Sequence, residues 1–375
     1  MGNLFNERKE KSTKGELLSV TLSNGVTKFS DLNKKDNSNI KSGNYKVVKK
    51  NDIPYNSMRM WQGASGVSSY DGIVSPAYTV LVPNRNSNSN FYAVLFKKKS
   101  ILNLFTRFSQ GLTSDTWNLK YPILKDIIVP FTNLEEQKRI FKIFNVINNL
   151  LALYDRKLKL LSQIKKYFLD NLFAKKEYPN LRFKGFTDAW EQRKLSSILI
   201  ERKDLSTESK QFPLSSFIQE KGVVPKSQRY DRSFLVKDSS KKYKVTKFGD
   251  FIYSSNNLDT GSIGLNSYGN AVISPVYSVF SSKNSNILET NFVNLLFQQN
   301  FYKNKMLRFR QGVMYGQLKI KEDDFLKVKV NVPSQIEIKN IINLFSKIES
   351  YATLLENKKK QLVQIKNTLL NTMFI

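Results

Sequence analysis

The sequence is an internal duplication with a period of about half its length. The pentapeptide RFSQG at residues 107–111 returns as RFRQG at 308–312, and IVSPAYTV at 73–80 returns as VISPVYSV at 272–279. Between such landmarks the two halves differ freely. A period this long indicates a duplicated domain and excludes a solenoid, whose repeats are roughly 20 to 50 residues long. We therefore predict two domains with a common frame and different loops, as expected of two sites of one kind that bind different targets.

Each half is predicted to be a mixed α+β domain. Segments of alternating or continuous apolar residues between turn-rich stretches are typical of short strands. We expect strands at 45–48, 73–82 and 127–130 in the first half and at 242–246, 251–254, 271–280 and 325–333 in the second. Residues 91–108 and 291–310 have a more helical pattern.

Each domain is followed by a long amphipathic helical pattern. Apolar residues recur there at alternating spacings of four and three, the heptad seam of a coiled coil. The seam residues are Phe144, Ile147, Leu151, Leu158 and Leu161 in the first helix and Phe345, Ile348, Leu355, Leu362 and Ile365 in the second. Two helices of roughly 60 Å can bury this stripe by pairing, and we predict an antiparallel pair with one domain at each end. The alternative is that each helix packs on its own domain.

These patterns divide the chain into four segments. Residues 1–131 form the first domain, 132–176 the first long helix, 177–333 the second domain with its lead-in segment, and 334–375 the second long helix. The predicted fold class is therefore α+β, with two tandem domains separated by two long helices that pair as an antiparallel coiled coil.

Composition restricts the chemistry of the chain and indicates its partner. The 375 residues include no histidine and no cysteine, which excludes disulfides, imidazole or thiolate metal ligands, and nucleophiles activated by histidine. Lysine and arginine number 60 against 31 acidic residues, a formal charge of +29 at pH 7. A bias toward lysine, asparagine and isoleucine explains part of this excess, but it does not require acidic residues to be half as frequent as basic ones. The balance favours a polyanionic partner.

Membrane and catalytic motifs are both lacking. No run of about 18 apolar residues is present and residues 1–14 are polar, so we expect no membrane span, no signal peptide and a cytoplasmic location. The sequence has no Pro-Pro turn, with which an adenine methyltransferase holds a flipped base, and no Walker-type loop for ATP. We expect a non-catalytic protein that binds no metal.

Three stretches resemble a known family. Residues 179–195, PNLRFKGFTDAWEQRKL, are similar to the lead-in to a target-recognition domain in the specificity subunit of Type I restriction-modification systems. The helical stretches LKLLSQIKK at 158–166 and KQLVQIK at 360–366 are similar to the spacer helices of that family. Together with the duplication, the resemblance covers almost the whole chain.

The resemblance implies a function and a set of partners. It implies two target-recognition domains of mixed α/β type, each binding a few base pairs in one half of a split site in double-stranded DNA, with the helical pair as a ruler between them. It also implies DNA methyltransferase (modification) subunits that bind the helices and carry S-adenosylmethionine, and a restriction and translocase subunit that uses ATP and magnesium. No cofactor is expected on this chain itself.

The first half departs from the family pattern at its start. Its residues 7–9, ERK, align with ERK at 201–203, so it lacks most of a counterpart to residues 179–199. We therefore expect that the first domain is less completely packed than the second.

Two clusters in each half are candidates for DNA contact. Asn, Gln and Arg can form bidentate contacts to adenine or guanine edges in the major groove. The first cluster contains Asn56, Arg59, Trp61 and Gln62, and Ser255, Asn256 and Asn257 at the aligned position. The second contains Arg107, Gln110, Arg308, Arg310 and Gln311, which we assign to the frame or to phosphate contact, and the unshared Ser114, Trp117 and Tyr315, which we assign to discrimination.

Other interpretations of these features remain open at this point. The polar residues of the first cluster can simply solvate a loop, and a repeated Gln-Gly can simply fix a turn. For the chain as a whole, the main alternative is a non-catalytic coiled-coil scaffold or adaptor without sequence-specific DNA binding, and an independent nuclease is the enzymatic alternative. Salt-sensitive binding to duplex DNA distinguishes a DNA-binding subunit from a scaffold.

Overall fold

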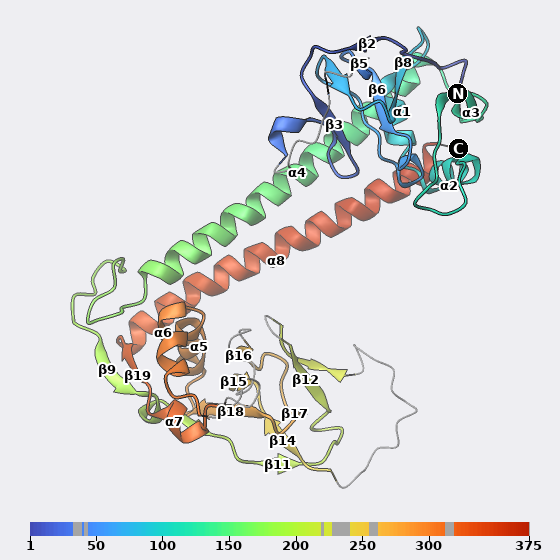
Figure 1. The fold of residues 1–375 in the computed structure, drawn as a ribbon. Coiled ribbons are helices and arrows are strands. Elements are labelled where there is room, and N and C mark those ends of the chain that lie inside the picture. The colour runs from blue at the N-terminus through green and yellow to red at the C-terminus, as the bar shows by residue number, and fades with distance from the viewer. Residues whose placement is uncertain are drawn as a thin grey trace. The chain divides into compact units, whose positions relative to one another are not determined.

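The computed structural model describes residues 1–32, 40, 44–218, 221–226, 241–254, 262–311 and 319–374, and it divides the chain into two compact units (Figure 1). Unit 1 contains Met1–Arg156 and Glu356–Ile375, and unit 2 contains Lys157–Leu355. Each unit therefore combines a globule with stretches of both long helices, whereas the sequence-based division treated the helices as separate segments.

Unit 1 is built from short antiparallel strands and three short helices. The strand orders are β1-β8-β6 in one sheet and β2-β5-β7 in a second, and β3 and β4 form a hairpin. The elements are β1 (Phe5–Glu7), β2 (Lys11–Ser12), β3 (Leu18–Thr21), β4 (Gly25–Lys28), the 3-10 helix η1 (Phe29–Asp31), β5 (Tyr45–Val48), β6 (Ile53–Asn56), η3 (Met60–Gln62), β7 (Gly72–Val74), β8 (Tyr78–Pro83), α1 (Ser89–Leu95), α2 (Lys99–Phe108) and α3 (Tyr121–Leu124).

Unit 2 repeats this strand order and adds to it. Sheets β10-β18-β15 and β11-β14-β17 and hairpin β12-β13 match those of unit 1, β16 extends the first sheet, and β9 pairs with β19. The elements are β9 (Glu191–Lys194), η4 (Leu195–Ser197), β10 (Leu199–Glu201), β11 (Leu205–Ser206), β12 (Ser215–Ile218), β13 (Gly222–Pro225), β14 (Tyr243–Thr246), β15 (Phe251–Ser254), β16 (Ile263–Leu265), β17 (Ala271–Ile273), β18 (Tyr277–Ser282), α5 (Ile287–Phe297), α6 (Asn300–Leu307), α7 (Glu322–Leu326) and β19 (Lys329–Val332).

Several predicted elements differ from the observed ones for local reasons. The strand predicted at 73–82 is divided into β7 and β8 because residues 75–78 form a turn, closed by the hydrogen bond from Tyr78 N to Ser75 O. The predicted strand at 325–333 begins as helix α7 and becomes strand β19 only at Lys329. The strand predicted at 127–130 is wrong: these residues follow α3 and pair with no strand among the described residues.

Two long helices, α4 (Leu134–Asn171) and α8 (Gln335–Thr372), follow the two globules. A side chain caps the start of each. Asn133 Oδ1 accepts from Glu136 N at 2.9 Å, and Ser334 Oγ accepts from Glu337 N at 3.3 Å. Such caps satisfy amides that have no partner within the helix.

The two long helices pair antiparallel within each unit. In unit 1, Lys366 Nζ donates to Asn148 Oδ1 at 2.7 Å and Lys359 Nζ binds Asp155 Oδ1 at 2.5 Å. Residue numbers thus rise along one helix as they fall along the other. In unit 2, Lys165 Nζ binds Glu349 Oε1 at 2.9 Å. These polar contacts join the two helices directly.

The predicted seam residues divide into three groups by exposure. Phe144, Ile147, Phe345, Ile348 and Leu355 are buried, while Leu151, Leu158, Leu161 and Leu362 are half-buried. Phe144 also belongs to the core of the unit 1 globule, and Phe345 to that of unit 2. Both interpretations of the stripe therefore apply, because the first turns of each helix pack on a globule while later turns face the other helix.

Ile365 is the exception among the predicted seam residues. Its side chain is 52% exposed, and the neighbouring Lys366 is half-buried and bonded to Asn148 of α4. The less exposed positions after Leu355 are 359, 362, 366 and 369, spaced four, three, four and three. The sequence-based prediction placed Ile365 in the seam because its side chain is apolar. The heptad spacing instead directs Lys366 toward α4, and the aliphatic part of its side chain covers the seam.

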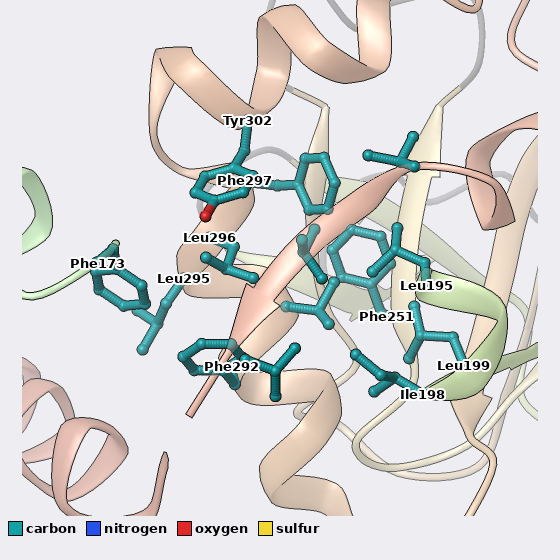
Figure 2. Packing of buried hydrophobic residues seen from close by; sticks show 14 of the residues in the cluster. Phe173, Leu195, Ile198, Leu199, Phe251, Phe292, Leu295, Leu296, Phe297 and Tyr302 are labelled. Atoms are coloured by element: carbon teal, nitrogen blue, oxygen red, sulfur yellow. The ribbon is translucent and has the colours of Figure 1, made fainter. Parts of the chain in front are cut away.

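Each globule has its own aromatic core, and each core includes a phenylalanine that follows a long helix. In unit 2, Phe173 lies beside Phe292 (Figure 2). Its ring centroid is 5.6 Å from that of Phe292 and 6.0 Å from that of Phe345. In unit 1, Phe374 lies 5.0 Å from Phe91 and 5.7 Å from Phe144. The end of α8 thus has the same role in unit 1 that the end of α4 has in unit 2.

Candidate nucleic-acid interface

A buried ion pair anchors the first sheet of both units. Arg8 donates to both carboxylate oxygens of Asp52, at 2.7 and 3.0 Å, and Arg202 repeats these contacts to Asp250 at the same distances. In each case the aspartate also accepts a backbone amide, from Lys49 at 2.8 Å and from Lys247 at 2.7 Å. Hydrogen bonding to the carboxylate raises the pKa of both guanidinium groups. The pair fixes the strand that leads toward the first predicted cluster.

A buried tyrosine on the strand that follows the aspartate holds a later segment of each unit. Tyr55 of β6 donates its hydroxyl to Leu119 O at 3.0 Å, and Tyr253 of β15 donates to Ile320 O at 3.2 Å. Burial raises the pKa of both hydroxyls, which therefore stay protonated and remain donors. The segment after the RF(S/R)QG repeat is thus held against the strand that carries the first cluster.

In unit 1 this arrangement brings the two clusters into direct contact. Trp61 and Trp117 meet edge to face, with ring centroids 5.2 Å apart and an interplanar angle of 79°. Leu119 N donates to Ser57 O at 2.9 Å, and Gln110 and Asn118 exchange two backbone hydrogen bonds. We call Asn56, Arg59, Trp61, Gln62, Arg107, Gln110, Ser114 and Trp117 the unit 1 recognition surface.

The polar side chains of this surface differ in exposure and in how many of their hydrogen-bonding groups already have a partner. Arg59, Arg107, Gln110 and Ser114 are exposed, and the only contact found for the Arg59 guanidinium among the described residues is a long one of 3.5 Å to Gln62 Oε1. Asn56 is half-buried and its Oδ1 accepts Met58 N at 3.0 Å. Trp61 is also half-buried and donates Nε1 to Met58 O. Arg59, Arg107 and Gln110 therefore have the most donors left for a ligand, while Asn56 and Trp61 also shape the turn.

Comparisons with known proteins agree on one family. The family model of the Type I restriction modification DNA specificity domain matches residues 2–163. The Type I restriction enzyme MjaVIII specificity subunit of Methanocaldococcus jannaschii is 24% identical over 351 residues, which cover 87% of this chain and 78% of that protein. The resemblance to the specificity subunits of Type I restriction-modification systems is thus confirmed, by a family model over residues 2–163 and by a relative over most of the chain.

Solved structures show that the fold is shared. The S subunit of a Type-I restriction-modification system from M. genitalium has a TM-score of 0.58 at 13% identity, covering 100% of this chain and 94% of that one. A structure described as the basis of complex assembly and conformational transition of the type I R-M system has a TM-score of 0.55 at 12% identity, covering 100% and 96%. The predicted α+β fold class, with domains linked by long helices, is confirmed.

The repeated residues make different contacts in unit 2. Gln311 Nε2 donates to Asp324 Oδ2 at 2.7 Å, so its side chain is bonded to α7 and is not free for a ligand. Arg308 is exposed at the end of α6, and Arg310 is half-buried. Ser255, Asn256, Asn257 and Tyr315 lie outside the described residues. The structure therefore assembles the predicted surface in unit 1, and in unit 2 it describes only Arg308, Arg310 and Gln311.

One residue that the sequence interpretation missed lies directly behind the unit 1 recognition surface. Lys97 donates to Gly63 O and, at 3.2 Å, to Ser65 O, two carbonyls of the turn after η3. Gly63 has a φ of 84°, in the left-handed region that favours glycine. Burial, with a smaller effect of Lys366, lowers the pKa of Lys97. The run of lysines at 97–99 resembles a solvated patch in sequence, so it gave no signal for this role.

The described residues contain neither an acidic metal site nor a helix suited to crossing a membrane. Within the described ranges, no group of three or more acidic residues is placed to hold a metal ion. Over the same residues, no helix combines the length and the apolar character that crossing a membrane requires.

Proposed function

We propose that the chain provides sequence specificity by binding one half of a bipartite DNA site with each unit. The observation that carries this proposal is the meeting of two separately predicted clusters through Trp61 and Trp117, on a frame that unit 2 repeats. Two copies of one frame with different surface residues suit two different half-sites. The formal charge of +29 supplies the attraction to the phosphate backbone that both units need.

The side chains of the unit 1 recognition surface divide the work of binding. Arg107 and Gln110, which the second half repeats, contact the phosphate backbone and set the register. Arg59 has an exposed guanidinium, held only by the long contact to Gln62, which suits guanine O6 and N7. Trp117, which has no counterpart in the second half, offers an apolar edge to a base or to a thymine methyl group. Unit 1 thus discriminates through Arg59 and Trp117 and positions through the shared residues.

The helices provide a surface for the methyltransferase subunit. Pairing within unit 1 leaves an apolar row on the outer face of α4, at spacings of three, four and three residues: Ile143 is 41% exposed, Val146 51%, Leu150 40% and Leu153 44%. A row of this kind on a helix predicts a protein partner. We assign it to the methyltransferase because a similar fold was solved in work on the assembly of the type I R-M system.

The chemistry belongs to the partners in this proposal. The chain has no catalytic residues of its own, and S-adenosylmethionine, ATP and magnesium bind to the methyltransferase and restriction subunits. The absence of histidine and of base-holding or ATP-binding motifs supports this division. The complex acts on DNA in the cytoplasm.

The decisive experiment uses the complex with its methyltransferase and sequencing of methylated adenines. Trp117→Ala is expected to relax or change one half of the methylated site and to weaken binding of the duplex by about 10-fold to 100-fold, equivalent to about 1–3 kcal/mol. Tyr70→Ala is the matched control, since Tyr70 is an exposed aromatic of unit 1 outside the recognition surface. An unchanged methylated sequence and unchanged affinity for Trp117→Ala would show that the surface is misplaced.

A further inference from the structure

Each unit contains a short β-hairpin that neither predicted cluster includes. Strand β3 pairs with β4 in unit 1 and β12 pairs with β13 in unit 2, each over four residue pairs. Between the paired ends the sequence is LSN at 22–24 and QEK at 219–221. A glycine follows in both, Gly25 with a φ of 63° and Gly222 with a φ of 72°, the left-handed conformation that closes a short hairpin loop. The two hairpins thus share their length, register and closing glycine, although their loops differ in every residue.

In unit 1 the hairpin packs directly against the segment that follows the first cluster. Gly66 belongs to this segment, and its amide donates to Pro54 O of β6 at 3.4 Å. A β-carbon at Gly66 would lie 2.9 Å from the Cα atom of Gly25 and 3.1 Å from the amide nitrogen of Val26. The two backbones are therefore in contact, and only glycine fits between them. This contact holds the hairpin loop next to the turn that carries the first cluster.

The hairpin of unit 2 makes the same kind of contact. Gly264 of β16 stands at the position of Gly66, because each lies ten residues after the end of the preceding strand, β15 or β6. A β-carbon at Gly264 would lie 3.0 Å from Cζ of Phe217 in β12, and a β-carbon at Gly222 would meet the carbonyl oxygen of Leu265 in β16. The buried frame of both units therefore places a hairpin beside this segment.

The loop of the unit 1 hairpin has a fixed backbone and exposed side chains. Thr21 Oγ1 accepts the backbone amide of Asn24 at 3.0 Å and donates to Gly25 O at 3.4 Å. Ser23 and Asn24 are exposed, and the described residues provide no hydrogen-bond partner for the side-chain amide of Asn24. Its donor and its acceptor are consequently both available to a ligand.

The equivalent residue of unit 2 is a lysine. Lys221 is exposed, and its backbone amide donates to Ile218 O at 3.1 Å. An asparagine amide can form two hydrogen bonds to adenine N6 and N7, whereas a lysine ammonium donates to guanine O6 and N7. The two loops therefore offer groups that suit different bases.

The combination of a shared hairpin and different loop residues is typical of base contact. A residue that positions the DNA backbone can serve both half-sites, whereas a residue that contacts bases must differ when the half-sites differ. A two-stranded β-ribbon also fits the width of the major groove of B-form DNA. The hairpins thus have the shape, the position and the variation expected of an element that contacts bases.

We propose that the two hairpin loops contact bases in the major groove, with Asn24 specifying an adenine in the unit 1 half-site and Lys221 a guanine in the unit 2 half-site. This inference rests on the proposed function and adds specificity-determining residues outside the recognition surface. Asn24 Oδ1 accepts from adenine N6, and Asn24 Nδ2 donates to adenine N7. The backbone contact between Gly25 and Gly66 keeps the loop in register with the first cluster.

The test uses the complex with its methyltransferase, sequencing of methylated adenines and binding of duplex DNA. Asn24→Ala should relax the preference at one base pair of one half-site and weaken binding of that site about tenfold, while binding of unrelated duplex stays unchanged. Asn24→Asp keeps the shape of the side chain but only accepts hydrogen bonds, so the preference should move from adenine to cytosine, whose N4 group donates. Asn86→Ala is the matched control, since Asn86 is an exposed asparagine in another turn of unit 1, and it should change neither measurement.

A variant of the second hairpin extends the test to unit 2. Lys221→Ala should change the preference at one base pair of the other half-site and leave the half-site of unit 1 unchanged. An effect of Asn24→Ala in the half-site opposite to that affected by Trp117→Ala would overturn the proposal, because Asn24 and Trp117 belong to the same unit.

The remaining outcomes separate this inference from the proposed function. If Asn24→Ala leaves the methylated sequence unchanged, or weakens binding of every duplex equally, the hairpin does not specify bases and the inference is wrong. The proposed function still stands in that case if Trp117→Ala changes one half-site. A change with Asn24→Ala but none with Trp117→Ala would support the hairpin and show that Trp117 does not contact bases. If none of the three variants Asn24→Ala, Lys221→Ala and Trp117→Ala alters the site, both proposals fail.

Discussion

The two units share the same buried contacts between strands, but they expose different side chains on their surfaces. The pairs Arg8–Asp52 and Arg202–Asp250 have identical distances, and both tyrosine hydroxyls bond the equivalent carbonyl. Outside this frame, Gln311 is bonded to Asp324 in unit 2, whereas the side chain of Gln110 is exposed in unit 1. Buried polar contacts are thus the same in both units, whereas exposed positions differ and can bind different partners.

The repeated glutamine shows that a shared motif does not imply a shared contact. Gln311 is bonded to Asp324 of α7. Gln110 stands at the equivalent position, exposed, with only its backbone bonded to Asn118 in the described contacts. In both units the residue closes a backbone bridge, so the repeat preserves the turn and leaves the side chain to local use.

The largest expected effect comes from exchanging one globule, which tests whether the two units bind DNA independently. Replacing residues 177–333 with the same region of another specificity subunit is expected to change one half of the methylated site completely and to leave the other half unchanged. The physical reason is that the frame contacts of each globule are closed within it. Sequencing of methylated adenines is the measurement. A change in both halves would mean that the units do not bind DNA independently.

Removal of the aspartate that pairs with Arg8 or Arg202 should lower the stability of both units by a similar amount. Asp52→Ala and Asp250→Ala each remove the carboxylate that binds a partly buried arginine through two hydrogen bonds, and we expect each to lower the free energy of unfolding by about 3–5 kcal/mol. Chemical denaturation measures the loss. Glu10→Gln is the control, since Glu10 touches Arg8 only at 3.7 Å from an exposed position, and it should cost less than about 1 kcal/mol. Unequal losses at the two aspartates would show that the frames differ in strength.

The phenylalanine that follows each long helix provides a finer comparison. Phe374→Ala and Phe173→Ala each remove a buried ring from a matching core, and each is expected to cost roughly 3 kcal/mol. Thermal unfolding followed by near-ultraviolet circular dichroism reports the change. If Phe374→Ala is nearly silent while Phe173→Ala is not, the end of α8 does not close unit 1.

The smallest expected effect concerns Lys366 in the seam. Burial lowers the pKa of its ammonium, so between the folded and unfolded pKa values the unfolded state binds more protons. The free energy of unfolding therefore rises with pH through that window, and the burial cost is present in full below it. Lys366→Met removes this cost and should change stability by less than about 1 kcal/mol. The difference from the parent should narrow as pH approaches the ordinary lysine pKa, and a widening difference would contradict the assignment.

The sequence predicted those features that depend on local pattern. The duplication predicted two globules of the same strand order, and the Asn, Arg and Trp residues at 56–62 and 107–117 were found as two separate clusters. Their meeting through Trp61 and Trp117 was not predictable, because the hydroxyl of Tyr55 that joins the two segments spans 64 residues of sequence. Lys97 was missed for the same reason, since its acceptors lie more than 30 residues away.

Two predictions were wrong because they took the pattern of apolar side chains alone as evidence of helix pairing or of a strand. Ile365 was placed in the seam although the heptad phase exposes it and buries the stem of Lys366. Residues 127–130 have the pattern of a strand, but a strand also needs a neighbour, and none of the described residues of unit 1 supplies one. Hydrophobic periodicity reports which residues prefer burial and cannot report whether a partner is present.

The position of Phe374 has a consequence for how the protein is made. Unit 2 is one contiguous stretch of chain, but unit 1 joins residues up to Arg156 with residues from Glu356 onward. A ribosome that adds about 5–20 residues per second needs on the order of ten to forty seconds to synthesise the chain between them. During that interval the first globule has left the exit tunnel with Phe91 and Phe144 uncovered. The half that is synthesised first is therefore the last to be finished, and a chain released early would present that aromatic surface to chaperones and proteases.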